Sequence, residues 1–216
     1  MGRPRRLSPP SSIHCCAHVA ETEPLEALVA RARACRLCAD QLPHGPHPVI
    51  RVSSTARVLI VGQAPGSKVH ATGIPWNDRS GDRLREWTGL DRETFYDEGR
   101  IAIVPMGLCY PGVDLHGGDR PPIPSCAPLW HPQFAKHLRR VRLTLLVGSY
   151  AQKFYLKERY PGSLGATIQN WRSFLPEFLP LPHPSWRNTA WLRRNPWFEA
   201  ELVPVLRERL REVLRH

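Results

Sequence analysis

The hydrophobic residues of this chain gather in short continuous runs, separated by longer stretches of mixed polarity. Runs of this length, bounded by turn residues, are typical of strands that are buried on both faces of a sheet. Four such runs predict strands at residues 57–61, 101–104, 143–147 and 178–181.

Helix signals lie between these runs. Pro24 stands at a first-turn position before an amphipathic stretch, and Ser80 can cap a helix that Gly89 ends. With the hydrophobic spacing elsewhere, these signals predict helices at 25–34, 80–88, 129–139, 150–157 and from Pro196 to about Leu214. Strands that alternate with helices predict an α/β fold of three layers, with a central four-stranded parallel sheet covered by helices on both faces.

Composition divides the chain into a tail and one domain. Residues 1–23 have no periodic hydrophobic pattern and begin with an Arg-, Pro- and Ser-rich stretch, so we expect a disordered tail. Residues 24–216 are long enough and hydrophobic enough for one well-buried domain. No apolar run approaches the length of a membrane span, so we expect no membrane association.

The charge balance points to a polyanionic partner. The chain carries 30 Lys and Arg against 19 Asp and Glu, a net charge of +11. This balance suits nucleic acid most simply, although a basic but inert surface would give the same numbers.

The turn after the first predicted strand is the first candidate for a ligand site. The stretch VLIVGQAPG, residues 58–66, runs from a buried strand straight into a tight turn. In open α/β sheets, ligands bind outside the carboxyl ends of the strands. No Gly-Lys-Ser/Thr follows as in a P-loop, and Pro65 breaks the spacing of the dinucleotide fingerprint.

Four cysteines have a spacing that suits a metal centre. Cys35 and Cys38 form a C-x-x-C pair, and Cys109 and Cys126 follow later in the chain. A C-x-x-C pair brings two thiolates close enough to share a metal ion or a cluster. The spacing alone leaves zinc, a cluster and ordinary buried cysteine open. A disulfide is disfavoured if the chain is cytosolic.

Taken in order, these motifs resemble the uracil-DNA glycosylase superfamily, and within it the iron–sulfur members, families 4 and 5. GQAPG at 62–66 is similar to their first motif, GIPWNDRSGD at 73–82 to the segment that follows, and HPSWRNT at 183–189 to their second motif. The resemblance spans about residues 25–197. It implies a DNA glycosylase of base excision repair, which flips uracil or a related deaminated base out of DNA and hydrolyses its N-glycosidic bond.

The resemblance also implies a cofactor. Each of the four cysteines matches a ligand of the families' 4Fe–4S cluster: Cys35, Cys38, Cys109 and Cys126. This match favours the cluster over zinc, which stays the alternative.

Two residues would be catalytic. The resemblance implies that Asp78 stabilises positive charge at the sugar and that His183 donates a hydrogen bond to the leaving base. Asp78 could instead cap the helix that begins near Ser80, and His183 could be a satisfied core histidine.

Other residues would bind the substrate and the surrounding DNA. The turn residues Gly62, Gln63 and Ala64 would bind the substrate. Trp76 would offer an aromatic face to the base, and Ser185 would contact a phosphate. Trp186 and Arg187 would bind DNA from the loop that enters the gap left by the flipped base. Arg187, Arg193 and Arg194 would form a basic rim that contacts phosphates. Trp76 could instead be a core aromatic, Gln63 a plain turn residue, and the last two arginines a solvated charge run.

Two positions depart from family 4. That family has Glu where this chain has Gln63, and an Asn that reads the base edge where this chain has Pro105. Pro105 has neither a side-chain amide nor a backbone N–H, which predicts weak discrimination of uracil from other deaminated bases. These departures leave two alternatives open: a non-catalytic iron–sulfur nucleic-acid-binding protein of the same fold, and a structural zinc protein. For the glycosylase we expect a DNA partner, a monomer, and a bacterial-type cytoplasmic location with association to the nucleoid.

Overall fold

The computed structural model describes residues 23–115 and 117–215. The predicted tail therefore lies outside the described residues, except for Glu23. The Glu23 carboxylate pairs with the Arg31 guanidinium at 2.5 Å.

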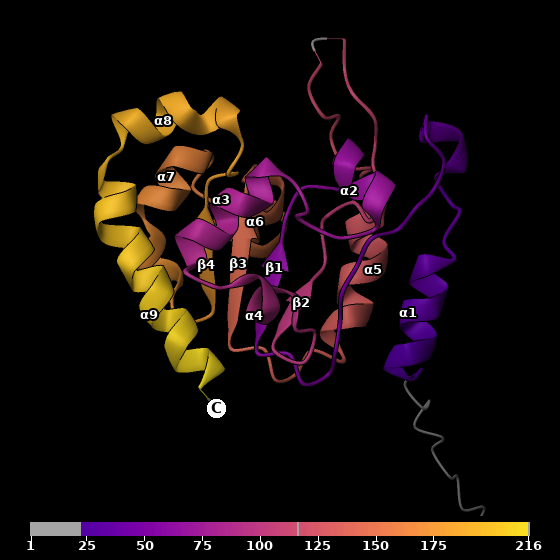
Figure 1. Ribbon diagram of the computed structural model, residues 1–216, viewed down its shortest axis with the longest axis horizontal. Helices are drawn as coiled ribbons and strands as arrows, with labels where there is room; N and C mark the ends of the chain where they lie inside the picture. The colour runs from indigo at the N-terminus through magenta and orange to yellow at the C-terminus, as the bar shows by residue number, and fades with distance from the viewer. Residues whose placement is uncertain (1–22, 116, 216) are drawn as a thin grey trace, which may run out of the picture.

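A single parallel sheet forms the centre of the molecule (Figure 1). Its strands are β1 (Val58–Val61), β2 (Ile101–Ile103), β3 (Leu143–Val147) and β4 (Phe178–Leu181), in the order β2-β1-β3-β4. Every neighbouring pair is parallel. The four predicted strands are thus confirmed, each within one residue at either end.

Alternate residues of each strand face two separate hydrophobic cores. In β1, Val58 and Ile60 face one core, whereas Leu59 and Val61 face the other. Because both faces are covered, the strands are hydrophobic at every position instead of alternating.

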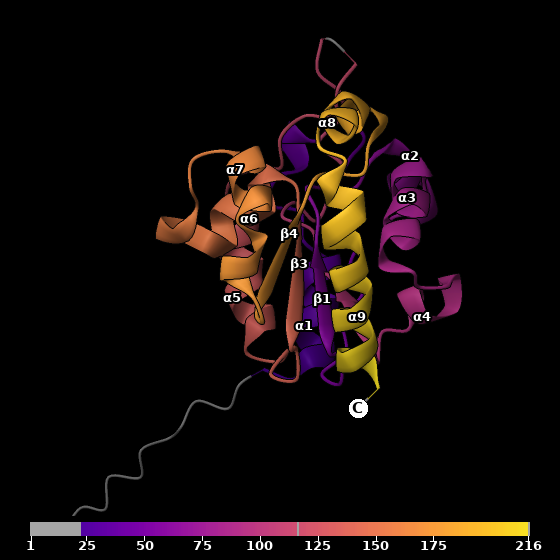
Figure 2. The same cartoon turned by 90° about the vertical axis from the view of Figure 1, so that its left-hand side faces the viewer.

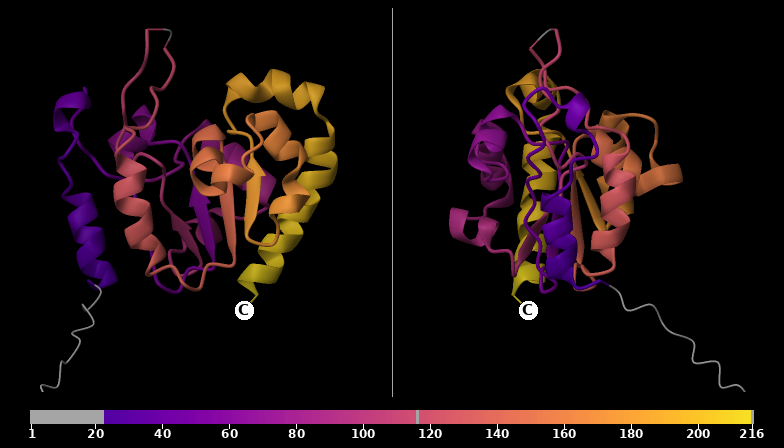
Figure 3. Two further views of the ribbon diagram at one scale, coloured as in Figure 1. Left: turned by 180° about the vertical axis from the view of Figure 1, so that it is seen from behind. Right: turned by 90° about the vertical axis from the view of Figure 1, so that its right-hand side faces the viewer.

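Helices cover each face of the sheet (Figure 2). The first core is closed by α3 (Arg79–Thr88), α4 (Arg92–Tyr96) and α9 (Val203–Leu214). The second is closed by α1 (Leu25–Arg33), α5 (Cys126–Ala135) and α6 (Ser149–Leu156), with α1 on the outer side of α5 (Figure 3). This confirms the predicted α/β/α layers.

Shorter helical segments complete the fold. They are α2 (Ser67–Thr72), α7 (Leu164–Gln169), α8 (Thr189–Arg194) and single turns at Ala39–Gln41, Lys157–Arg159, Trp171–Phe174 and Trp186–Asn188. Helix α2 follows the carboxyl end of β1 and α8 follows that of β4, so both lie beyond the same end of the sheet (Figure 1).

Three predicted helix boundaries were wrong. The helix expected at 129–139 is α5, which begins at Cys126, because Pro128 falls in the first turn, where a missing N–H costs nothing. The last helix starts as a wide π-helical turn, Phe198–Leu202, before α9. Pro204 has no N–H to donate to the preceding turn, which explains the wide turn. The N-cap of α3 is Asp78, not Ser80.

Among the residues that the structure describes, no helix is long and apolar enough to cross a membrane.

Candidate active site

A cavity of about 510 Å³ opens where the four strands end. Its lining comes from the turns after the strands and from the loop at residues 111–115 and 117–120, which projects at the top of Figure 1. Nine of the predicted site residues line it: Gly62, Gln63, Ala64, Trp76, Asp78, His183, Ser185, Trp186 and Arg187. The carboxyl edge of the parallel sheet thus gathers motifs that lie far apart in the sequence.

The turn after β1 is fixed by its neighbours. The carbonyl oxygens of Gly62 and Gln63 accept hydrogen bonds from the backbone N–H groups of Met106 and Gly107, each at 2.9 Å. The peptide N–H groups that follow these carbonyls therefore point away from the Met106–Gly107 segment, because C=O and N–H lie on opposite sides of a trans peptide. The Gln63 side chain is also engaged, since Nε2 donates to the backbone oxygen of Arg120 at 3.1 Å.

Trp76 forms one wall of the cavity. Its ring centroid lies 5.7 Å from that of His183, with 34° between the ring planes. A Cβ added to Gly62 would lie 2.7 Å from Cζ2 of this indole, so the turn needs glycine to let the ring approach. The backbone of Trp76 has φ +57°, the left-handed region that bulky residues rarely adopt. The indole lines the cavity and, being only partly buried, also packs against the core on the α3 side of the sheet.

Asp78 both caps a helix and faces the cavity. Its Oδ1 accepts a hydrogen bond of 2.8 Å from the backbone N–H of Gly81 in the first turn of α3. Its Oδ2 lies 3.9 Å from the position that a Cβ on Gly66 would occupy. The capping interpretation is correct, and it leaves the second oxygen directed at the cavity.

His183 follows β4 and is half-buried. The side-chain amide of Asn188 donates to its backbone oxygen at 2.7 Å. Desolvation lowers the pKa of His183, and the nearby Asp78 carboxylate opposes that change. The imidazole is accordingly neutral at neutral pH, the form that carries one donor nitrogen and one acceptor nitrogen.

Asp119 is a cavity residue that the sequence analysis missed. Its Oδ2 also lies 3.9 Å from the position of a Cβ on Gly66, so two carboxylates face the same glycine. Desolvation raises the pKa of Asp119, Arg187 opposes that change, and Asp78 adds to it. No motif marks Asp119, because it sits in a Gly- and Pro-rich loop whose path the sequence does not specify.

The rim of the cavity holds the predicted DNA-contacting loop. Ser185 lines the cavity and Trp186 beside it is 76% exposed. The Arg187 guanidinium donates to the backbone oxygen of Gly117 at 2.9 Å and thereby joins this loop to the one that carries Asp119. Arg193 and Arg194 belong to α8 and do not line the cavity.

Pro105 lies in the cavity wall at the position that the sequence analysis singled out. Its backbone oxygen accepts from Nε2 of the buried His131 at 3.0 Å, and Nδ1 of His131 lies 2.7 Å from the Tyr155 hydroxyl. Since Nε2 must donate to the carbonyl, Nδ1 accepts from the hydroxyl.

The four cysteines that the sequence analysis singled out line one smaller, mostly apolar cavity: Cys35, Cys38, Cys109 and Cys126. Burial raises the pKa of Cys109 and of Cys126 to about 11 in the free-thiol form. The backbone N–H of Leu108 lies 3.3 Å from Sγ of Cys126 and can donate to a thiolate there. Among the described residues, no three His, Cys, Asp or Glu side chains stand close enough to hold one metal ion.

The distance between the ligating thiolates differs between a zinc site and a four-iron cluster. Four thiolates on one zinc ion, each about 2.3 Å from it, would lie within about 4 Å of one another. In a four-iron cluster each thiolate binds a different iron, so the ligands stand further apart. The four thiols line one apolar cavity and so offer the donor set that either centre needs.

Comparison with known families agrees with this geometry. The family model described as the uracil DNA glycosylase superfamily matches residues 50–207. The matched segment contains the four described strands, Cys109, Cys126 and every residue that lines the large cavity except Val49, whereas Cys35 and Cys38 precede it. Enzymes of this family are hydrolases that act on DNA, in keeping with the basic charge of the chain. The chain belongs to the uracil DNA glycosylase superfamily.

Proposed function

We propose that this protein is a DNA glycosylase that excises uracil and related deaminated bases by hydrolysing the N-glycosidic bond. The observation that carries the proposal is the convergence of Trp76, Asp78 and His183 around one cavity next to the Gly62–Ala64 turn. A base inside a duplex is out of reach, so it must be flipped into such a cavity at a cost of a few kcal/mol, on the order given for unstacking and unpairing.

Each group would act at one part of the flipped nucleotide. The indole of Trp76 offers a flat face for the base. When the C1′–N bond breaks, its electron pair goes to the base, and positive charge develops on the sugar. Oδ2 of Asp78 would stabilise that positive charge, and neutral His183 with the backbone N–H groups of the turn would stabilise the negative charge on the base. Water then adds its oxygen to C1′, and the proton that it loses neutralises the departing base, which leaves an abasic site and the free base.

The lining of the cavity supports a broad choice of base. Pro105 offers only its carbonyl, which already accepts from His131, and one N–H of the Gln63 amide is committed to the Arg120 carbonyl. A site without a committed donor–acceptor pair at the base edge discriminates weakly between related bases. We therefore expect the excision rates of uracil, hypoxanthine and xanthine to differ by much less than the roughly 10⁴-fold discrimination of a site that hydrogen-bonds the distinguishing group of its substrate.

We also propose that Cys35, Cys38, Cys109 and Cys126 hold a 4Fe–4S cluster. The four thiols that line one apolar cavity support a shared metal centre, and their match to the cluster ligands of the families that the chain resembles supports the cluster over zinc. A bound cluster would supply a covalent cross-link between the segment after α1 and the start of α5. Cys109→Ser should lower the iron content well below about four per chain and remove the broad visible absorbance. Stoichiometric zinc without iron, in protein prepared without oxygen, would refute the cluster.

Excision is tested by alkali cleavage of oligonucleotides that contain one uracil, hypoxanthine or xanthine. The expected result is cleavage at the modified position with each base, and loss of cleavage in Asp78→Asn. Tight, salt-sensitive binding of the same oligonucleotides without any cleavage would instead establish a non-catalytic nucleic-acid-binding protein.

A further inference from the structure

The segment that carries Trp76 adopts a backbone conformation that its own residues do not favour. The φ of +57° at Trp76 places a bulky aromatic residue in the left-handed region. Such conformations persist when surrounding contacts fix them, and they are common at functional sites. Gly81 allows this backbone to approach α3 closely, because a Cβ there would lie 1.7 Å from the Trp76 carbonyl oxygen.

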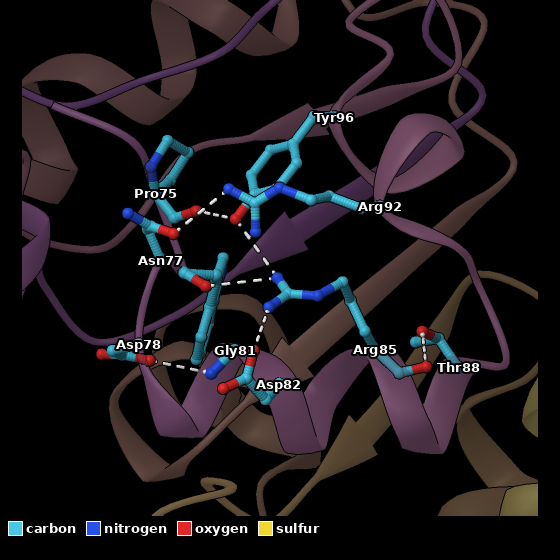
Figure 4. Close-up of polar contacts among 10 residues, drawn as sticks. Pro75, Asn77, Asp78, Gly81, Asp82, Arg85, Thr88, Arg92 and Tyr96 are labelled. Carbon is cyan, nitrogen blue, oxygen red and sulfur yellow. Dashed lines mark hydrogen bonds and ion pairs between the residues drawn. The ribbon is translucent and has the colours of Figure 1, made fainter. Parts of the chain in front are cut away.

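Two side chains that do not line the cavity, Arg85 and Tyr96, form hydrogen bonds to this segment. Nη1 of Arg85 donates to the Trp76 carbonyl oxygen at 3.3 Å and to the Tyr96 hydroxyl at 3.2 Å. That hydroxyl donates in turn to the Pro75 carbonyl oxygen at 2.9 Å. Figure 4 shows the Arg85 guanidinium and the Tyr96 hydroxyl meeting next to the Pro75 carbonyl group. Two consecutive carbonyls are thus fixed by one connected network.

The network is itself held firmly. The Arg85 side chain is only 11% exposed, and its Nη2 forms a 2.6 Å ion pair with Asp82 one turn earlier on α3. The guanidinium also lies over the rings of Phe95 and Tyr96, at 5.3 and 5.7 Å from their centroids. A planar fork that is held in this way places two nitrogens in a fixed geometry, whereas a lysine offers a single ammonium on a flexible stem.

We infer that Arg85 and Tyr96 are positioning residues, which hold the Trp76 backbone in its left-handed conformation so that the indole forms the wall for the flipped base. Neither side chain lines the cavity, so both act through Trp76. The inference rests on the proposed function, because it assumes that the Trp76 indole contacts the flipped base.

A double-mutant cycle measures this coupling. Single-turnover excision of a uracil oligonucleotide is measured for Arg85→Lys and for Tyr96→Phe, each with and without Trp76→Ala. We expect each single change to slow excision roughly tenfold, within the range for contacting residues. In the Trp76→Ala background each should cost less than about twofold, because the positioned ring is gone.

Arg207→Lys is the matched control. Arg207 also donates to backbone oxygens of α3, those of Glu86 and Trp87, at 2.8 and 3.2 Å. It does not line the cavity, so its replacement should leave the excision rate within about twofold. Equal losses in Arg85→Lys and Arg207→Lys would overturn the inference, as would losses that multiply fully with Trp76→Ala. If Arg85→Lys fails to fold, Tyr96→Phe, which removes a single oxygen, decides the question.

A second readout is independent of activity. In protein labelled with 5-fluorotryptophan, the resonance lost in Trp76→Phe identifies Trp76. We expect that resonance to shift or broaden in Tyr96→Phe and to remain unchanged in Arg207→Lys. An unchanged resonance in Tyr96→Phe overturns the inference even if the enzyme is active. A wild type that excises no base, with a resonance that shifts as expected, refutes the proposed function and leaves the positioning role standing.

Discussion

Asp78 has two roles that a pair of substitutions separates. Its Oδ1 caps α3 through the Gly81 N–H at 2.8 Å, whereas its Oδ2 faces the cavity. Asn caps a helix about as well as Asp does, but it carries no charge. Asp78→Asn therefore removes the electrostatic role and keeps the cap, and Asp78→Ala removes both.

The two roles predict different magnitudes. Removal of one electrostatic stabiliser from a transition state costs roughly a hundredfold or more in rate, about 2.7 kcal/mol. Loss of a helix cap costs about 1 kcal/mol of the free energy of unfolding. We expect Asp78→Asn to lose at least about a hundredfold in single-turnover excision, with a free energy of unfolding within about 0.5 kcal/mol of wild type. Asp78→Ala should show the same loss of rate and a further loss of about 1 kcal/mol in stability.

Asp91 offers a matched control for the cap. It is the N-cap of α4, and its Oδ1 accepts from the Thr94 N–H at 2.7 Å, but it does not line the cavity. Asp91→Ala should lose a similar stability in urea unfolding and keep its excision rate. Full activity in folded Asp78→Asn would refute the catalytic assignment, and Asp119, the second carboxylate that faces Gly66, would become the candidate.

Three further predictions follow from other parts of the molecule. His183→Ala should slow single-turnover excision by at least roughly a hundredfold. Because burial lowers the pKa of His183, the wild-type excision rate should stay constant from pH 8 down to about 6.5. An excision rate that already decreases between pH 8 and about 6.5 would contradict a neutral imidazole. Affinity for duplex DNA should fall steeply with salt. Arg187→Ala should reduce activity more than Arg193→Ala, because only Arg187 lines the cavity and holds Gly117, and equal effects would argue against this. Burial lowers the pKa of His131 to about 4 in the folded protein, whereas the unfolded chain has the ordinary value of about 6.5. Between these two values the unfolded chain binds a proton that the folded protein does not, so the free energy of unfolding falls as the pH drops from about 6.5 toward 4, by about 3 kcal/mol. Urea unfolding of His131→Gln should show a flatter pH profile than wild type, and an identical slope would rule His131 out as the source.

The sequence alone determined the layers of the fold and the edge at which the site lies. Runs such as 58–61 are hydrophobic at every position because both faces of the sheet are covered, so each run identified a strand. The carboxyl ends of parallel strands meet at one edge, which placed the Gly62–Ala64 turn and His183 together. Short elements such as α2 and α8 gave no usable signal, because six residues are too few for helical periodicity to show.

Only the tertiary structure decided how the side chains of the site are held. Asp119 meets Asp78 at Gly66 because of the path of a long loop, and loop paths depend on contacts that no local pattern encodes. The left-handed backbone of Trp76 depends on Arg85 and Tyr96, which approach it from α3 and from α4. Local sequence favours elements through propensity and periodicity, whereas these contacts join segments that become neighbours only once the sheet and its helices have packed.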